Sequence, residues 1–592
     1  MGIVAIGLAH AYLLRWASDD AFITFRYIDQ WLAGNGLVFN PGEHVEGYTH
    51  PLWLFLLTPF RAAGLPLVSA SMFLGLLSFA GLLILLARRC PVTALALALH
   101  SEMATWATGG LETMLFTFET LGLVWMVARG RAFLAGLLSV AVVLTRPDGA
   151  LFAVCAGVFV TLWSNGPGRV SGSVSECVNG GGSGSRSGSG SGSARGRGRN
   201  AIGAALRFLT PIVLLLGPYL AWKVWYYGDL FPNPYYAKSG GSAWWSQGGY
   251  YLWTVVRGHP TTLLGVLPLL AATLAILRVP LPARLGERLR DTGSEEARRI
   301  LVAVAFSCVY LSLFVARVGG DFMYARFVVP VLPLLLLSFE GTVRLAVRDH
   351  AWPRQSVWLL WLLPVFVLAE NRTSRASLFL DAASSDRHRR LQGIEDERWY
   401  WTRDIGGGES RLQQARRYGA YFAEVFEGTD VTVSILGQAA LGYYGRFPRV
   451  VEENGLTEPR IARRPLRTHG RPGHEKRASL DDLRALGVDF RLLLAEPEDQ
   501  PYRIVHFRIS DYAVTGELVR YDAALVSKLR TERADRVHVV DFPEYFDRWA
   551  MNEAGRLTRV QLNDVGAAFE AFYFRYNDDP RRWERLRNLM GT

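Results

Sequence analysis

Long apolar stretches recur along the first 370 residues of the chain and then stop. Stretches that approach the length needed to cross roughly 30 Å of hydrocarbon predict membrane-spanning helices. The apolar stretch Leu52–Phe60 is cut by Pro59 and Arg61, so we expect it to lie at the membrane surface or to re-enter without crossing. We expect about eleven spans, at residues 2–17, 67–87, 91–107, 111–128, 132–146, 149–163, 206–227, 260–278, 300–318, 327–343 and 356–370.

Arg-rich connections between these stretches predict the topology. They lie at alternate connections, and positively charged connections tend to stay in the cytoplasm. The connections are Arg88–Arg89, Arg129–Arg131 and residues 186–207, 278–299 and 344–354. This assignment places residues 18–50, 228–259, 319–326 and everything after residue 370 on the outer side.

The pattern changes after residue 370 to short apolar runs mixed with amphipathic segments. "VTVSILG" (431–437), "FRLLLAE" (490–496) and "RVHVVDF" (536–542) predict buried strands. "SLDDLRALG" (479–487) and "DPRRWERLRNLM" (579–590) predict helices. The predicted fold class is therefore a polytopic α-helical membrane domain, residues 1–370, followed by a soluble α/β domain on the outer side, residues 371–592.

Residues 164–200 are rich in Gly and Ser and end in an Arg-rich stretch. Such a composition buries too little apolar surface to offset the entropy lost on ordering, so we expect a disordered cytoplasmic linker. Contact of its arginines with anionic lipid is the alternative.

Composition narrows the class of protein. Half of the 592 residues are hydrophobic and the mean hydropathy is +0.14. The net charge of +11 sits largely in the connections and the linker, so we expect no nucleic-acid partner. The four cysteines are scattered without metal-ligand spacing, and the sequence indicates no metal site and no cofactor.

The first outer loop concentrates candidate chemistry where the chain leaves the bilayer. Asp19 and Asp20 precede the predicted helix "AFITFRYIDQWL", and "HVEGYTHPLW" then returns to the membrane. The two carboxylates are either the N-cap of that helix and nothing more, or part of a site. Acids, imidazoles and aromatic rings at the bilayer surface are the components of a site for a polar substrate carried on a lipid.

"DDAFITFRYIDQWLAGNGLVFNPGEHVEGYTHPLW" resembles the first periplasmic loop of bacterial polyprenyl-phosphate-dependent glycosyltransferases of the GT-C class. It is most similar to the AftB-like arabinofuranosyltransferases of mycobacterial cell-wall assembly. Relatives often read "GLTD" where this chain reads "GLTE", so Glu458 departs from the family pattern. The resemblance covers most of the chain and continues at "ATGGLETMLF", "TRPDGAL", "YYGDLFPNPYYAKSG", "RVGGDFMYARFVVPVLPLL" and "ENGLTEPRIARRPLRTHGRPGHEKR".

The resemblance implies transfer of a sugar, arabinofuranose, from a polyprenyl-phosphate donor to a cell-envelope glycan acceptor at the outer face of the bacterial inner membrane. A carboxylate at this boundary can accept the acceptor's hydroxyl proton. Adjacent residues on a helix do not face one way, so only one carboxylate points at the reacting carbon; we favour Asp20, with Asp19 as a cap. The family's retention of configuration leaves a carboxylate nucleophile and front-face attack both open.

Candidate substrate-binding residues lie at the outer ends of the predicted spans and in the outer domain. Cationic side chains suit the donor phosphate, and Lys238 is the strongest candidate because the chain has few lysines. We expect Asp321 to pair with Arg326. The "RPGHEK" loop either helps to position the acceptor or is an ordinary surface turn. The full set is Arg26, His44, Glu46, Tyr48, His50, Lys238, Arg317, Asp321, Arg326, His474, Glu475 and Lys476.

Two other classes of protein compete with an enzyme. A transporter or flippase of lipid-linked sugar would show charged residues or broken helices at mid-membrane and an internal repeat. A membrane-anchored protein that binds wall polysaccharide would need no catalytic group. Because most charges lie at the ends of the spans, we prefer glycosyl transfer.

Overall fold

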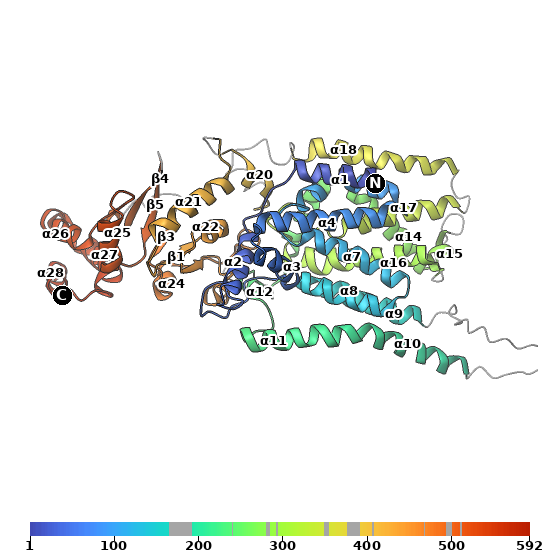
Figure 1. Ribbon diagram of the computed structural model, residues 1–592, viewed down its shortest axis with the longest axis horizontal. Coiled ribbons are helices and arrows are strands. Elements are labelled where there is room, and N and C mark those ends of the chain that lie inside the picture. Colours follow the sequence, from blue (N-terminus) through green and yellow to red (C-terminus); the bar gives the residue numbers. More distant parts are fainter. Residues whose placement is uncertain are drawn as a thin grey trace, which may run out of the picture. The chain divides into compact units, whose positions relative to one another are not determined.

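Two packed units make up the chain in its computed structural model (Figure 1). The first, the helical unit, comprises Met1–Ala17, Thr49–Leu230 and Ser242–Arg398; the second, the sheet unit, comprises Ser18–Tyr48, Phe231–Gly241 and Trp399–Thr592. Most of the predicted linker lies outside the described residues. The structure describes residues 1–164, 192–238, 241–279, 285–291, 294–348, 354–375, 391–404, 408–466, 468–492, 500–509 and 512–591.

Helices occupy the apolar stretches of the helical unit. Its first half contains α1 (Gly2–Leu13), α3 (Pro51–Ala62), α4 (Leu67–Ala87), α5 (Pro91–Leu99), α6 (Ser101–Trp106), α7 (Thr113–Ala128), α8 (Ala132–Thr145), η1 (Pro147–Gly149), α9 (Ala150–Ser164), α10 (Gly192–Pro211), η2 (Ile212–Leu216) and α11 (Gly217–Tyr227). Its second half contains α13 (Trp245–Gly258), η3 (Pro260–Gly265), α14 (Val266–Ile276), α15 (Leu285–Arg290), α16 (Glu295–Val309), η5 (Tyr310–Ala316), α17 (Leu332–Arg348), η6 (Arg354–Trp361) and α18 (Leu362–Arg375).

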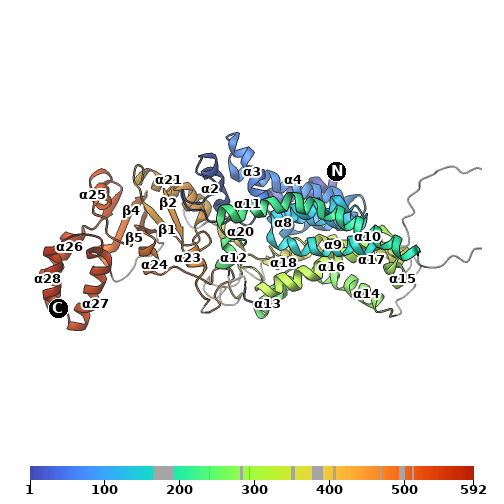
Figure 2. The ribbon, with the colours of Figure 1, turned by 90° about the horizontal axis from the view of Figure 1, so that it is seen from below.

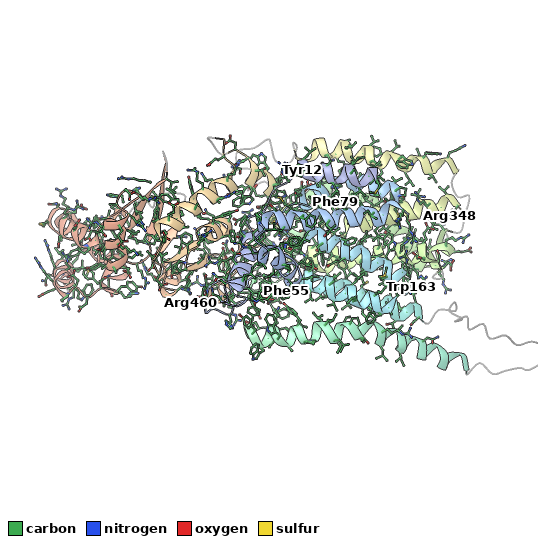
Figure 3. All side chains as sticks on the ribbon, viewed as in Figure 1. Tyr12, Phe55, Phe79, Trp163, Arg348 and Arg460 are labelled. Carbon is green, nitrogen blue, oxygen red and sulfur yellow. The ribbon has the colours of Figure 1, made fainter. Side chains whose placement is uncertain are left out.

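Among the described residues, four helical stretches are long and apolar enough to cross a membrane: Leu67–Ala87, Pro147–Ser164, Asn200–Tyr227 and Glu295–Ala316. A fifth arises if α13 and the η3–α14 segment, which meet at a bend of 111°, form one broken span. The helical, membrane-type character of this unit is confirmed, and the count of about eleven spans stays a prediction. Phe79 of α4, labelled in Figure 3, is fully buried between the helices.

Arginines from three separate Arg-rich connections meet two glutamates at the start of α16. Arg89 and Arg129 contact the Glu295 carboxylate at 2.7 and 3.3 Å, and Arg348 contacts Glu296 at 2.8 Å. Arg348 lies at the same end of the helical unit as Trp163, the penultimate residue of α9 (Figure 3). This gathering agrees with one shared side for these connections, while the choice of the cytoplasmic side stays a prediction.

Two breaks between helices lie against α18. Glu370 and Asn371 of α18 bind the backbone groups that have no helical partner at these breaks. The first break is at His100, between α5 and α6. There the Asn371 side chain accepts a hydrogen bond from Ser101 N at 3.0 Å and donates one to Leu99 O at 2.6 Å. Backbone groups that are buried at a helix break require such partners because water does not reach them.

The second break is at His259, between α13 and η3. The Glu370 carboxylate accepts hydrogen bonds from Thr261 N at 2.5 Å and from Thr261 Oγ1 at 2.7 Å. These bonds satisfy the first turn of η3, whose positive end favours a negative partner. Glu370 and Asn371 therefore supply hydrogen-bond partners at both breaks.

The sheet unit contains strands and helices from distant parts of the sequence. Its helices are α2 (Ala21–Leu32), α12 (Asn233–Ala237), α21 (Arg411–Val425), α22 (Ala439–Tyr444), α23 (Pro459–Ala462), α24 (Leu480–Ala485), η8 (Pro501–Arg503), α25 (Ala523–Glu532), α26 (Phe542–Asn552), η9 (Ala554–Arg556), α27 (Arg559–Phe569), η10 (Glu570–Phe574) and α28 (Pro580–Met590); α20 (Glu397–Thr402) spans the boundary. Its strands are β1 (Thr432–Ile435), β2 (Arg449–Glu452), β3 (Phe490–Leu492), β4 (Ile504–Ile509), β5 (Tyr512–Leu518) and β6 (Val537–Val539).

The six strands form one mixed sheet in the order β2-β1-β3-β5-β4-β6. β1 is parallel to β2 and β3 and is fully buried, as its apolar sequence predicts. The predicted strands are confirmed as β1, β3 and β6, and the predicted helices as α24 and α28. In both views α25 to α28 lie beyond the β4-β6 side of the sheet, and α2 lies on the β2-β1 side (Figure 1, Figure 2).

Because β1 leads to β2 on one side and the chain then continues to β3 on the other, the direction of winding reverses at β1. Open parallel sheets bind ligands at the carboxyl ends of their strands beside such a reversal. Asp19 of the first outer loop binds the start of α22, which follows this end of β1.

Candidate active site

Hydrogen bonds within the sheet unit join three of the segments that resemble the arabinofuranosyltransferase family. Asn233 N donates to Glu46 O at 2.8 Å, and the Asn233 side chain donates to Gly455 O at 2.7 Å and to Leu456 O at 3.0 Å. One asparagine thus ties the first outer loop, the "FPNPYYAKSG" segment and the "ENGLTE" turn together. The three motifs were identified in the sequence, but their contacts with one another were not predicted.

Lys476 makes a second tie. Its ammonium donates to Tyr236 O at 2.7 Å and to Ala462 O at 2.5 Å, and the side chain is buried. These contacts favour a structural role for Lys476 over the predicted contact with substrate.

The structure divides the predicted site residues between the two units. The sheet unit holds Asp19, Asp20, Arg26, His44, Glu46, Tyr48, Lys238, His474, Glu475 and Lys476, and the helical unit holds His50, Arg317, Asp321 and Arg326.

Asp19 binds the start of a helix from the C-terminal part of the chain. Its two carboxylate oxygens accept hydrogen bonds from Ala439 N and Ala440 N, each at 2.8 Å, and the residue is buried. These amides open α22 directly after the Gly437 turn at the end of β1, a position that favours anions. Asp19 therefore fills this anion-binding position and anchors the first outer loop on the sheet.

Asp20 differs from its neighbour in burial and partners. It occupies the N-cap position of α2, but its side chain makes no capping hydrogen bond, so the alternative of a simple helix cap does not account for it. Asp20 is partly exposed. It interacts electrostatically with His474 and with Glu452, which come from the "RPGHEK" loop and the end of β2.

The "RPGHEK" loop carries polar groups on which Lys238 and Asp20 act electrostatically. Burial lowers the pKa of His474 to about 4, with Arg471 and Lys238 adding to the effect and Asp20 opposing it. His474 is therefore a neutral imidazole near pH 7, not a cation. Burial also raises the pKa of Glu475, whereas Lys238 acts to lower it. Among the described residues, no group of three His, Cys, Asp or Glu side chains is arranged to hold a metal ion.

The guanidinium group of Arg26 is hydrogen-bonded to other residues of the protein. Its guanidinium donates to Phe39 O at 2.8 Å, to Phe447 O at 2.9 Å, and to Gly442 O and Asn40 Oδ1 at 3.3 Å. The side chain is buried. These contacts favour a structural role over the predicted binding of phosphate.

Tyr48 packs beneath the first outer loop and supports it. Its ring packs edge-on against the Tyr27 ring, with centroids 5.0 Å apart, and Tyr27 Oη donates to Val45 O at 2.6 Å. A Cβ on Gly47 would lie 2.7 Å from the Thr457 methyl group, so only glycine fits between the loop and the "ENGLTE" turn. His44, by contrast, is exposed.

A buried charge network in the helical unit includes one predicted residue, His50. Its Nδ1 lies 3.4 Å from a Glu112 oxygen, and Arg146 contacts Glu112 at 3.2 Å and Asp148 at 3.1 Å. Tyr310 Oη donates to Asp148 at 2.9 Å. Arg146 and Asp148 belong to the "TRPDGAL" motif, but the sequence did not predict that they interact.

Asp321 and Arg326 form the predicted pair, with Oδ2 and Nε 2.5 Å apart and both side chains buried. That prediction is confirmed. Arg317 is partly exposed, and its carbonyl oxygen accepts a hydrogen bond from Trp244 N at 2.7 Å.

Ionisable side chains also cluster at the helix breaks. The sequence did not predict such a cluster, and its absence was part of the case against a transporter. His259 lies 3.8 Å from both Glu102 and Glu370, and its ring centroid is 4.4 Å from that of His100. All four residues are buried and, Glu370 excepted, line a small cavity. The helical unit therefore does contain a broken helix with buried charges.

The long apolar helices of the helical unit are typical of a membrane protein, and the sheet unit carries the carboxylates of the first outer loop and of β2. The chain is 28% identical over 384 residues to the terminal β-(1→2)-arabinofuranosyltransferase of Corynebacterium glutamicum, covering 60% of this chain and 52% of that protein. It is 29% identical over 381 residues to the protein of the same name from Mycobacterium tuberculosis, covering 57% and 53%.

These similarities confirm the resemblance to the AftB-like arabinofuranosyltransferase family. The chain spans about half the length of the curated relatives it matches. No protein-family model matches the chain, and no solved structure matches it.

Proposed function

We propose that this chain is a glycosyltransferase that moves a sugar, arabinofuranose, from a polyprenyl-phosphate donor to a glycan acceptor of the cell envelope. The two curated relatives, named as arabinofuranosyltransferases, support the reaction class and the sugar. The polyprenyl-phosphate donor rests on the resemblance of the first outer loop to GT-C enzymes.

The observation that carries the proposal is the surroundings of Asp20. This carboxylate is partly exposed, makes no capping bond, and interacts with His474 and Glu452 of the sheet unit. Asp19, one residue earlier, is held by two backbone amides and fixes where the loop sits. A fixed scaffold beside an accessible carboxylate is what a general base or nucleophile requires.

In the proposed reaction, the bond between the sugar's anomeric carbon and the phosphate oxygen breaks, and its electron pair leaves with the phosphate. A bond forms between the anomeric carbon and the acceptor oxygen, and the hydroxyl proton passes to Asp20. Lys238 is the cation we assign to the phosphate, since charge-assisted contacts to phosphate are strong. Two variants of this scheme retain configuration: a covalent sugar intermediate on Asp20, and front-face attack beside the departing phosphate.

We place the reaction at the outer face of the bacterial inner membrane. The meeting of Arg89, Arg129 and Arg348 at the start of α16 supports a single side for the Arg-rich connections. The positive-inside rule makes that side cytoplasmic, which leaves the first outer loop and the sheet unit outside.

Transport of the lipid-linked sugar is the second candidate function. The broken α13–α14 segment and the buried cluster around His259 favour it, because transporters build sites at such breaks. Binding of wall polysaccharide without reaction has no comparable observation in its favour.

The test is transfer of radiolabelled sugar by purified protein, both in detergent and reconstituted into vesicles. Polyprenyl-phosphate arabinofuranose and a soluble arabinan acceptor are supplied together, and the same donor with a different sugar serves as the matched control. Labelled, elongated acceptor supports the proposal. Labelled lipid that crosses vesicle bilayers without any labelled acceptor contradicts it and supports transport.

A further inference from the structure

Two stacked aromatic rings lie exposed on the segment that forms α12. The centroids of the Phe231 and Tyr235 rings are 4.6 Å apart, and 20° separates the ring planes. Phe231 is 47% exposed and Tyr235 is 37% exposed, whereas Asn233 and Ala237 of the same segment are buried. The segment therefore packs one face into the sheet unit and leaves an aromatic face outside.

The buried face is fixed to the sheet unit at several points. Asn233 donates hydrogen bonds to the first outer loop and to the "ENGLTE" turn. Lys476 donates to Tyr236 O at 2.7 Å, and the guanidinium carbon of Arg463 lies 5.1 Å from the centroid of the Tyr236 ring. These contacts hold α12 in place, so the two outer rings cannot turn inward to leave water. Burying such a ring is favourable, and an outside partner can supply the burial.

The chain reaches this segment directly from a candidate membrane span. The span, Asn200–Tyr227, ends four residues before Phe231, and four residues extend at most about 14 Å. Its last turns are aromatic: the Trp222 and Tyr226 rings stack with centroids 5.3 Å apart, and Trp225 is 80% exposed. Trp and Tyr gather where a membrane meets water. The stacked pair therefore follows closely on an interfacial belt.

We propose that Phe231 and Tyr235 form a membrane-contact patch of the sheet unit, and that their rings enter the headgroup region of the bilayer. The lipid surface is the partner because the patch continues the aromatic belt of the span, and amphipathic rings are stable at that depth. A glycan acceptor is the competing occupant of exposed rings. Each ring of this pair is covered on one face by the other, which leaves less surface for a sugar to stack on.

The patch also bears on the donor. Lys238 follows Tyr235 by three residues at the end of α12, and residues three apart on a helix lie on one side of it. Rings held in the headgroup region would set Lys238 at the depth of the lipid phosphates, where a polyprenyl-phosphate donor presents its own. This step rests on the proposed function and deepens it, whereas the membrane contact does not depend on that function.

The first test measures depth in the bilayer. In full-length protein without native cysteines, Tyr235→Cys carries a fluorescent label, and the protein is reconstituted into vesicles whose lipids bear a nitroxide quencher on the headgroup. Tyr576→Cys is the matched control, because Tyr576 is a tyrosine of the sheet unit with the same exposed fraction, 37%. We expect strong quenching at position 235 and little at position 576.

Two outcomes of this experiment overturn the membrane contact. One is quenching at position 235 that is no stronger than at position 576. The other is a label at position 235 that responds to a soluble arabinan but not to the quencher lipid, which would assign the patch to the glycan acceptor.

The second test separates donor binding from turnover, with donor and protein in the same vesicles. Tyr235→Glu places a charge in the headgroup region and should raise the donor KM by roughly tenfold, as expected for losing the burial of one ring, with kcat close to native. Tyr235→Trp keeps an interfacial side chain and should keep the native KM. Because the native ring is exposed, Tm should change little in either variant.

Tyr576→Glu is the control and should leave the donor KM unchanged. A lower kcat at unchanged KM in Tyr235→Glu, or equal KM values in Tyr235→Glu and Tyr235→Trp, overturns the placement of Lys238 by the patch. If native protein transfers no sugar, the proposed function fails, while the quenching experiment still tests the membrane contact. If transfer occurs and position 235 is not quenched, the function stands and the patch falls.

Discussion

Asp19 and Asp20 are adjacent, yet the structure predicts that their loss damages different properties. Asp19→Asn keeps one acceptor oxygen and presents an amide to a backbone N–H of α22 in place of the other. Losing one hydrogen bond to a charged group, together with the charge at the helix start, costs about 2–4 kcal/mol. For a domain of 150–250 residues this corresponds to a Tm lower by about 4–16 °C.

Asp20→Asn should do the reverse. Asparagine is a good residue at an N-cap position, and the native side chain makes no capping bond that it could lose, so Tm should change little. Removing a positioned base or nucleophile lowers the rate by about 100- to 10,000-fold. Thermal unfolding followed by tryptophan fluorescence and sugar transfer at saturating donor are the two measurements.

Asp29→Asn, which removes a charge from the same helix, is the control and should change neither quantity. Retention of more than about a tenth of native activity by Asp20→Asn would refute its assignment as base or nucleophile. A large loss of rate in Asp19→Asn at unchanged Tm would show that the carboxylate bound to α22 takes part in the reaction itself.

Three further predictions concern the donor, the helical unit and the topology. Lys238→Ala should weaken apparent donor affinity by roughly tenfold or more, from loss of about 1.5–3 kcal/mol. Lys528→Ala, which removes a partly exposed lysine bonded to Gly428 O, should not; equal donor KM values in both variants would place the phosphate elsewhere. Arg146→Met leaves two buried carboxylates without their shared partner and should destabilise the helical unit by about 3–5 kcal/mol, measured as a lower Tm in detergent; an unchanged Tm would contradict it. In a variant without native cysteines, Asp535→Cys should react with an impermeant thiol reagent in intact cells and Ser185→Cys should not; labelling at residue 185 reverses the assigned sides.

Apolar length predicted most helices of the helical unit, and strand-like runs predicted three of the six strands, because burial dictates both patterns locally. The predicted span 91–107 is divided at His100 into α5 and α6, and "VTVSILG" contains β1. The joining of the first outer loop to the C-terminal segment was not predictable in this way. It depends on single polar contacts such as those of Asn233 and Asp19 across hundreds of residues, and neither side chain carries a local signal for its partner.

Within the site, residue type alone overstated the number of groups available to a substrate. Arg26 and Lys476 carry the positive charge that suits phosphate, but their N–H groups donate hydrogen bonds to backbone carbonyl oxygens. Glu452 was not predicted, because it is the last residue of β2 and belongs to none of the motifs that the sequence singled out.

The bonds that α18 makes to the two helix breaks also constrain the order in which the helical unit can mature. Ser101 and Asn371 are 270 residues apart, so the α5–α6 break is synthesised long before its partner exists. Thr261 waits in the same way for Glu370. Until α18 packs against the two breaks, their buried backbone groups lack these partners. The nascent chain must therefore satisfy both breaks with water or with other proteins, and the helical unit completes these contacts only after α18 has been synthesised.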